Sequence, residues 1–326
     1  MDAFLSAAAA YAGGEPSETL RQLTRGFLLR ARDDASAVEE ATAALALPTL
    51  SPHGAAWVGV VLGAVIEDRG GAQRSAPAII DLLRSWLAQL PSAPGGSSEV
   101  PRPTPRQAQL LDALKQLAPS VVAHLARTPD LRAKLSQDLA LLDRLEALEA
   151  YTAGAAWIRE MLLRSSGSLI LLHVPSGKGL RLRYENVATC FHLFSLIQAT
   201  VGERIPGGRA PSPLVAAAAR GKAREAVQDE AWWHYGDPRS KVPELRSAIW
   251  GEALVREIPV VAGERVVLLW PAIQASRSWD SAFFGPQLDA LRPDVVIESE
   301  LSPAECATWF QTLGIRQARR RWWWPW

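Results

Sequence analysis

Apolar residues recur at steps of three and four through the first 90 residues, which is the spacing of helices that bury one face. Proline, glycine or aspartate signals end each apolar stretch, and serine or proline signals begin the next one. The pattern predicts successive helices over about 17–31, 36–46, 52–69 and 77–90. Helix pairs of this length are typical of α-solenoids, although no residue signature repeats along the segment.

Proline, glycine and serine dominate residues 91–106, which offer little apolar surface to bury. This composition predicts an exposed linker or long loop. Helical spacing resumes over 107–165, with a leucine stripe up to Pro119, a short second piece and a longer helix from Thr128. The leucine spacing in this stretch is typical of a helical bundle.

The apolar pattern changes near Ser168, where a continuous apolar run precedes a glycine turn and an alternating run. This order predicts a β-hairpin, and a second hairpin is expected to turn near Ala262. A helix over 185–201 is expected after the first hairpin. Later elements are expected to be a helix near 280–291, a strand at 294–299 and a helix from Ser302 to about Leu313.

Together these elements predict a mainly α protein with a smaller α/β, or α+β, C-terminal module. The N-terminal part is expected to consist of helical hairpins or a bundle. The predicted parts are a helical domain at 1–90, a linker at 91–106, a bundle segment at 107–165, a mixed module at 166–315 and a tail at 316–326.

Charge and composition narrow the classes of function. The chain has 35 basic and 34 acidic residues, so a nucleic-acid partner is not expected. Its longest uncharged apolar run, 54–66, is too short to span about 30 Å of hydrocarbon, and no secretory leader is evident, so a cytoplasmic location is expected. Cys190 and Cys306 are too few for a disulfide framework. Abundant alanine, with far more arginine than lysine, indicates a GC-rich bacterial gene.

The segment at 231–240, AWWHYGDPRS, is the most site-like stretch of the sequence. Aromatic rings beside a histidine, an aspartate and an arginine in one loop are able to stack a flat ligand or anchor a partner. The alternative interpretation is an aromatic loop that fills the seam between two subdomains. The candidate binding residues are Trp232, Trp233, His234, Tyr235, Asp237 and Arg239.

The predicted helix at 185–201 carries the only candidates for catalysis. Glu185 and His192 fall on one helical face, where they are candidates for general acid–base chemistry. A solvated or structural polar face is the alternative interpretation. His173, in an apolar strand, is expected to be a hydrogen-bonded core residue. No closely spaced His or Cys set is present, so neither a metal site nor a cofactor is expected.

Two further motifs lack residues that their chemistry requires. The segment PSGKG at 175–179 has neither the early glycine nor the final hydroxyl of a phosphate-binding loop, which favours a hairpin turn. The segment at 292–300 begins like a metal-dependent nuclease motif but is followed by no acidic-x-lysine element. Neither motif therefore predicts an activity.

The chain ends in an unusual combination of arginine and tryptophan. Arginine binds phosphate and indole prefers the bilayer interface, so this tail is suited to a membrane surface. A partner groove, a stacked nucleic acid and a frayed tail without function are the alternatives. The candidate contact residues are Arg319, Arg320, Arg321, Trp322, Trp323, Trp324 and Trp326.

These features lead to three hypotheses about function. The first is a non-catalytic interaction or accessory protein of a bacterium, which binds a protein partner through helical surfaces and a Trp-rich C-terminal module. The second is a hydrolase or transferase with a His/Glu acid–base pair. The third is a peripheral protein that the tail anchors to a membrane surface.

Overall fold

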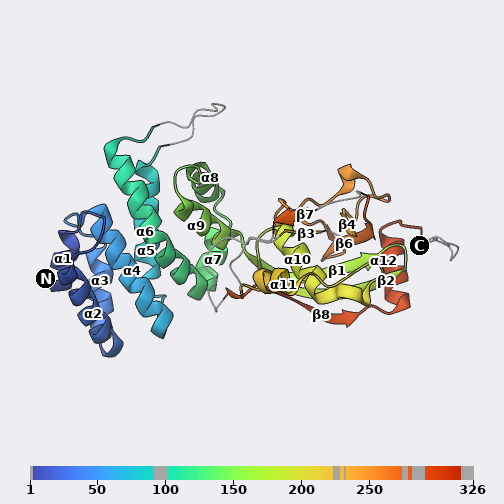
Figure 1. Cartoon of the computed structure of the whole chain (residues 1–326), viewed down its shortest axis with the longest axis horizontal. Helices are drawn as coiled ribbons and strands as arrows, with labels where there is room; N and C mark the ends of the chain where they lie inside the picture. Colours follow the sequence, from blue (N-terminus) through green and yellow to red (C-terminus); the bar gives the residue numbers. More distant parts are fainter. Residues whose placement is uncertain are drawn as a thin grey trace. The chain divides into compact units, whose positions relative to one another are not determined.

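A computed structural model of the chain describes residues 3–91, 102–222, 228–230, 233–273, 278–280 and 291–316. These residues form two compact units, which divide between Leu162 and Leu163. We call them the N-terminal unit and the C-terminal unit. The fold class predicted from the sequence is confirmed, because helices dominate and a mixed sheet lies in the C-terminal half (Figure 1).

The described part of the N-terminal unit is helical. Side chains of Ser17, Ser51 and Thr104 cap three of its helices by accepting hydrogen bonds from backbone N–H groups, as polar N-cap residues do. The helices are α1 (Ala3–Ala9), α2 (Glu18–Asp33), α3 (Ala35–Ala44), α4 (Pro52–Arg69), α5 (Ala76–Gln89), α6 (Pro105–Arg127), α7 (Pro129–Leu135), α8 (Leu139–Leu148) and α9 (Ala153–Leu163).

Helices α4 and α6 form the centre of this unit. Two glycines on α4 allow the close approach: a Cβ on Gly59 would lie 2.4 Å from Leu117 Cδ1, and one on Gly63 would lie 3.0 Å from the Cα of Ser120. The hydroxyl of Ser120 donates to the carbonyl of Gly59 across the contact, at 2.5 Å. The apolar character of α4 on all sides therefore reflects a buried helix.

Three details of the predicted helices are wrong. Pro119 does not end its helix, because α6 continues to Arg127 with buried side chains on both sides of the proline. The long helix expected from Thr128 is two helices, α7 and α8, with Asp138 as the N-cap of α8. Helix α3 begins at Ala35 rather than at 36, because Asp34 is its N-cap. In α6, burial of the apolar face stabilises the helix by more than the loss of the one backbone hydrogen bond that Pro119 removes.

The main sheet of the C-terminal unit has the strand order β4-β6-β1-β2-β8, with β5 paired to the start of β6. Strands β1 and β6 are parallel, and the other pairs are antiparallel. A separate ribbon joins β3 and β7. The strands are β1 (Ser165–His173), β2 (Lys178–Val187), β3 (Gln228–Glu230), β4 (Trp233–Gly236), β5 (Val260–Val261), β6 (Glu264–Pro271), β7 (Ser278–Asp280) and β8 (Asp294–Glu300).

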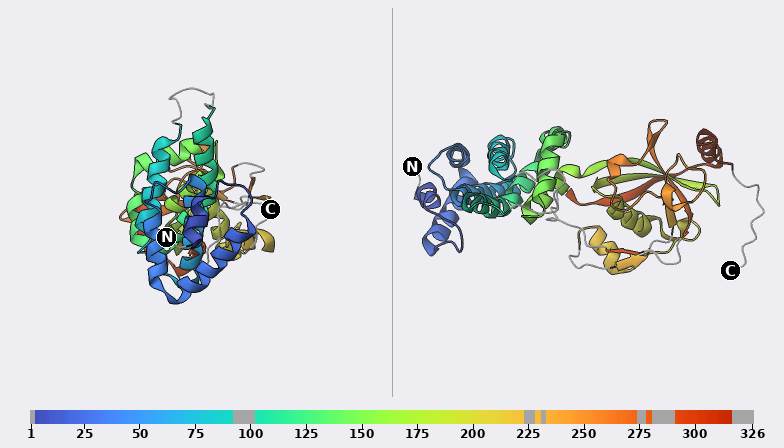
Figure 2. Two further views of the ribbon diagram at one scale, coloured as in Figure 1. Left: turned by 90° about the vertical axis from the view of Figure 1, so that its left-hand side faces the viewer. Right: turned by 90° about the horizontal axis from the view of Figure 1, so that it is seen from above.

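Both faces of this sheet are covered. Alternate residues of β1 show the division, since Leu169 and Leu171 join the core under α10 (Cys190–Val201), whereas Ile170 and Leu172 join the core under α12 (Pro303–Thr312). The right-hand view of Figure 2 shows α10 and α12 on the two sides of the strands. The other helical elements within the described residues of this unit are α11 (Pro213–Ala219) and the 3-10 turns Gly202–Arg204, Leu245–Ser247 and Val255–Glu257.

Both predicted hairpins are confirmed, since β1 pairs with β2 and β5 with β6. The second hairpin turns at Ala262 and Gly263, both with positive φ, as a tight hairpin turn requires. The helix predicted from Glu185 is wrong at its start, because β2 continues to Val187 and α10 begins at Cys190. The helix predicted near 280–291 lies almost entirely outside the described residues.

Candidate functional site

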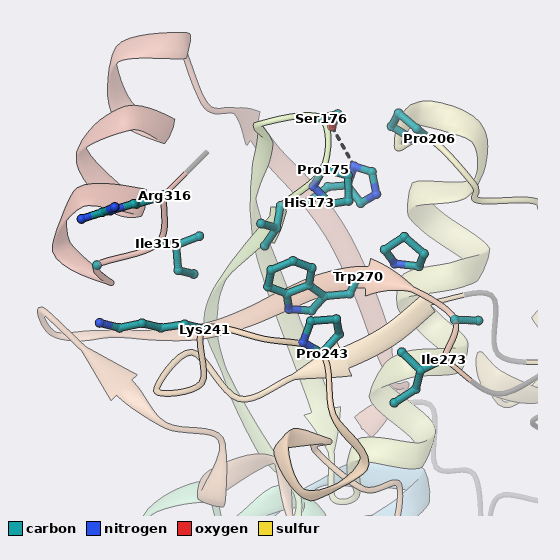
Figure 3. A pocket seen from close by; sticks show the side chains of 14 residues that line it. His173, Pro175, Ser176, Pro206, Lys241, Pro243, Trp270, Ile273, Ile315 and Arg316 are labelled. Atoms are coloured by element: carbon teal, nitrogen blue, oxygen red, sulfur yellow. Dashed lines mark hydrogen bonds between the residues drawn. The ribbon is translucent and has the colours of Figure 1, made fainter. Parts of the chain in front are cut away.

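A cavity of about 1050 Å³ lies where the parallel strands β1 and β6 end. The two strands reach it with His173 and Trp270, and the residues that follow each strand form part of its wall. The carboxyl ends of neighbouring parallel strands are the usual place for a ligand site in an α/β sheet. Its remaining walls come from the loops that contain Pro206 and Pro243 and from the end of α12 (Figure 3).

The indole of Trp270 forms the centre of the cavity wall (Figure 3). It is the next-to-last residue of β6 and points to the face that α12 covers, where it is half-buried. Pro243 and Pro271 line the cavity beside it, and Ile273 and Ile315 add aliphatic surface. A half-buried tryptophan among rigid rings is the kind of anchor that dominates many binding interfaces.

The turn between β1 and β2 supplies the polar part of the wall. His173 Nδ1 and Ser176 Oγ share a hydrogen bond of 2.7 Å, and Ser176 Oγ also accepts from the backbone N–H of Lys178. Burial and, to a smaller extent, the nearby charge of Lys178 lower the pKa of His173 to about 4. His173 is therefore neutral at neutral pH and adds no charge to the cavity.

The charge of the cavity comes from Lys241 and Arg316. Lys241 follows β4 and packs over the end of α12, since a Cβ added to Gly314 would lie 3.3 Å from its Nζ atom. Gly314 has a φ of 64°, a conformation that glycine adopts without strain. No carboxylate is among the described residues that line the cavity, so its wall is cationic.

Trp233 supports the cavity from the core. Its indole Nε1 donates to the carbonyl of Pro206 at 3.3 Å, and the ring of Pro206 lines the cavity. A Cβ on Gly208 would lie 2.4 Å from the Trp233 ring, so this loop packs directly on the indole. Trp233 therefore positions part of the wall without facing the cavity.

The predicted aromatic loop is instead the edge strand β4. Trp233, His234 and Tyr235 are at most 1% exposed. Tyr235 stacks on Phe194 of α10 with ring centroids 3.7 Å apart, and its hydroxyl donates to Gln198. This burial corrects the expectation of an open recognition loop: the three side chains are part of the core rather than a surface for a ligand.

Asp237 and Arg239 form a local turn. The Asp237 carboxylate accepts from the backbone N–H of Arg239 at 2.8 Å and pairs with its guanidinium. Partial burial is the largest single influence on the pKa of Asp237 and raises it. The hydrogen bonds and the charge of Arg239 together outweigh burial, so the pKa of Asp237 lies below its ordinary value. The pair thus shapes the turn that leads to Lys241. Trp232, the remaining candidate, lies outside the described residues.

The structure separates Glu185 from His192. Glu185 is on strand β2, where it pairs with Arg183. His192 is 3% exposed on α10, and its Nε2 lies 2.7 Å from the carbonyl of Ala219. Burial lowers the pKa of His192 to about 4. Because one residue is on a strand and the other is enclosed, the shared helical face expected for acid–base chemistry does not exist.

The C-terminal tail is a predicted contact site, whereas no metal site is expected from the sequence. Arg319, Arg320, Arg321, Trp322, Trp323, Trp324 and Trp326 lie outside the described residues. Within the described ranges, no three His, Cys, Asp or Glu side chains converge as a metal ion would need. None of the helices in these ranges combines the length and apolar character that crossing a bilayer requires.

Comparisons with models of protein families, with curated proteins and with solved structures found no match to this chain. Sequence reasoning missed Trp270, Lys241 and Arg316 as site residues. The available signal was indirect: two fully apolar strand segments end at His173 and Trp270, and parallel strands place such ends together.

Proposed function

We propose that this protein is a non-catalytic interaction protein whose C-terminal unit holds a segment of a partner protein in the Trp270 cavity. The observation that carries the proposal is a half-buried indole at the centre of a large cavity at the carboxyl ends of β1 and β6. Aromatic anchors in concave, largely apolar sites supply much of the binding energy of protein interfaces.

The size and surroundings of the cavity favour a chain segment over a single small molecule. Its volume of about 1050 Å³ reaches the upper end of the range of small-molecule sites, which is about 300–1,000 Å³. Val242 and Leu245, in the loop that carries Lys241 and Pro243, are each 48% exposed. Exposed apolar side chains beside an aromatic pocket are typical of a surface that a partner covers.

The proposal also includes a cellular location and a role for the N-terminal unit. We place the protein in the bacterial cytoplasm, on its alanine- and arginine-rich composition and its two buried free thiols. The N-terminal helices serve in this proposal as a second partner surface or as a scaffold.

A selection from a random-peptide display library against the full chain tests the proposal. We expect enriched peptides to bind the wild type and to lose binding to Trp270→Ala. Trp250→Ala is the matched control, because Trp250 is 47% exposed in the same unit and does not line the cavity. Peptides that bind Trp270→Ala as well as the wild type, or a selection without enrichment, would contradict the proposal.

One observation favours hydrolysis as a second candidate function. Ser176 is exposed at the cavity, and its Oγ lies 2.7 Å from His173 Nδ1, the geometry of a nucleophile beside a base. Two features rank it below binding: a histidine with a pKa of about 4 is a weak base, and no carboxylate of the described lining orients the ring. Labelling of Ser176 by a fluorophosphonate probe would support hydrolysis, and its absence in the folded protein would exclude an activated Ser176.

A further inference from the structure

We infer that the partner segment is acidic, and that it places a carboxylate between Lys241 and Arg316 and an apolar side chain on Trp270. This inference rests on the function proposed above and adds the chemistry of the ligand. It follows from the sign of the charges that line the cavity and from their place on one side of Trp270.

Several arginines of the C-terminal unit pair with acidic side chains, whereas the two cations of the cavity do not pair with any among the described residues. Arg181 pairs with Glu264, Arg220 with Asp294 and Arg239 with Asp237. Over the described ranges, Lys241 and Arg316 have no such carboxylate partner. A cavity wall with two cations and no acid attracts an anion and repels a basic segment.

The two charged side chains of the cavity lie on one side of Trp270, with Ile315 beside them. Figure 3 shows Lys241 and Arg316 on one side, with Ile273 and Pro206 on the other and Trp270 between them. Because His173 is neutral, the positive charge is confined to the first side. A segment that carries Asp or Glu next to a large apolar residue satisfies both sides in one orientation.

The charge pattern also separates this ligand from the chain's own tail. Arg319, Arg320 and Arg321 carry the same sign of charge as Lys241 and Arg316, which disfavours the tail as the occupant. An acidic segment of a partner is therefore the better occupant of the cavity. Occupancy by the tail is the alternative that the experiment below distinguishes.

Three dye-labelled octapeptides provide the probes. Each has the same core of phenylalanine, proline and leucine, and two flanking positions are aspartate, asparagine or lysine. Fluorescence anisotropy with the full chain measures the affinity of each peptide. We expect the aspartate peptide to bind about tenfold more tightly than the asparagine peptide, and the lysine peptide to bind most weakly. The preference for aspartate is expected to weaken as salt is added.

Charge reversal assigns the effect to the two cations. The double variant Lys241→Glu/Arg316→Glu is expected to invert the order, so that the lysine peptide binds best. Lys222→Glu is the matched control, because Lys222 is exposed in the same unit and does not line the cavity. Binding of the lysine peptide to the double variant shows that this variant is folded.

The outcomes separate this inference from the proposed function. Equal affinity for the three peptides, with loss of all binding in Trp270→Ala, would overturn the inference and leave the function standing. Failure of all three peptides to bind would overturn both. Binding that appears only after deletion of residues 317–326 would assign the cavity to the tail and overturn the inference.

Discussion

The indole of Trp270 packs across Gly236 of the neighbouring strand: a Cβ added to Gly236 would lie 3.1 Å from both Cδ1 and Nε1 of the ring. Gly236 pairs with Leu268, two residues before Trp270 on β6. A residue of the buried edge strand therefore sets the position of the ring that forms the cavity wall.

Gly236→Ala is expected to displace this ring without unfolding the sheet. The added methyl group fits only if the indole of Trp270 shifts by a few tenths of an ångström. We expect this shift to lower the affinity for the peptide about fivefold. Anisotropy with the aspartate peptide measures the loss. Gly26→Ala, where no atom lies within 4 Å of the added Cβ, is the control and leaves affinity unchanged. Wild-type affinity in Gly236→Ala would show that the position of the ring does not matter.

Acid is expected to destabilise the protein through three buried histidines. Burial lowers the pKa of His124, His173 and His192 to about 4, below the ordinary value of 6.5. Between these values the unfolded chain binds protons that the folded chain does not. The free energy of unfolding therefore falls as pH falls from 6.5 to 4, by about 3 kcal/mol for each group.

His124→Leu isolates one of these contributions. Its ring lies 2.9 Å from Ser75 Oγ and 2.7 Å from the carbonyl of Ser120, so the variant is less stable at pH 7. The difference in unfolding free energy between pH 7 and pH 5 is nevertheless about 2 kcal/mol smaller than in the wild type. Urea titrations at both pH values measure it. An unchanged difference would mean that His124 is not neutral in the folded protein.

Arg144 is expected to hold the end of α5 in place. Its guanidinium donates to the carbonyl of Leu87 in the last turn of that helix and to the carbonyls of Leu90 and Pro91, which follow it. A lysine keeps the charge but lacks the planar fork, so Arg144→Lys costs about 1–3 kcal/mol of unfolding free energy. Denaturant unfolding measures the loss, and Arg84→Lys, at an exposed ion pair, is the control. Equal stability of both variants would show that the fork is not needed.

The Arg/Trp tail gives a separate prediction for the membrane hypothesis. If the tail binds membranes, the full chain sediments with vesicles that contain anionic lipid, and a variant that lacks residues 319–326 stays in solution. Replacing the three arginines by glutamine reduces binding by about 1 kcal/mol for each charge. Equal sedimentation of the full and shortened chains would remove the membrane hypothesis.

Elements with strong local signals were predictable from the sequence. Ser302 caps α12 in a capping box, and the hairpin turn at Ala262 and Gly263 lies where the sequence indicated it. Pro119 and Glu185 show where local signals fail. The packing of α6 on α4 overrides the proline, and pairing of β2 with β8 keeps Glu185 in a strand.

The cavity could not be predicted from local sequence patterns, because its residues are far apart along the chain. His173, Lys241, Trp270 and Arg316 come from four segments that are distant in sequence. The parallel pairing of β1 with β6 and the return of α12 bring them together, and neither has a local signature. The conspicuous aromatic segment at 233–235 lies in the core behind this site, because edge strand β4 closes the sheet there.

Fluorine NMR of the full chain labelled with 5-fluorotryptophan tests whether a bound segment contacts Trp270. Loss of one resonance in Trp270→Phe assigns that ring, and Trp250→Phe assigns an exposed control. Titration with the aspartate peptide is predicted to shift the Trp270 resonance along the same saturation curve as the anisotropy and to leave Trp250 unmoved. If a peptide binds while the Trp270 resonance stays in place, Trp270 is not the anchor of the binding site.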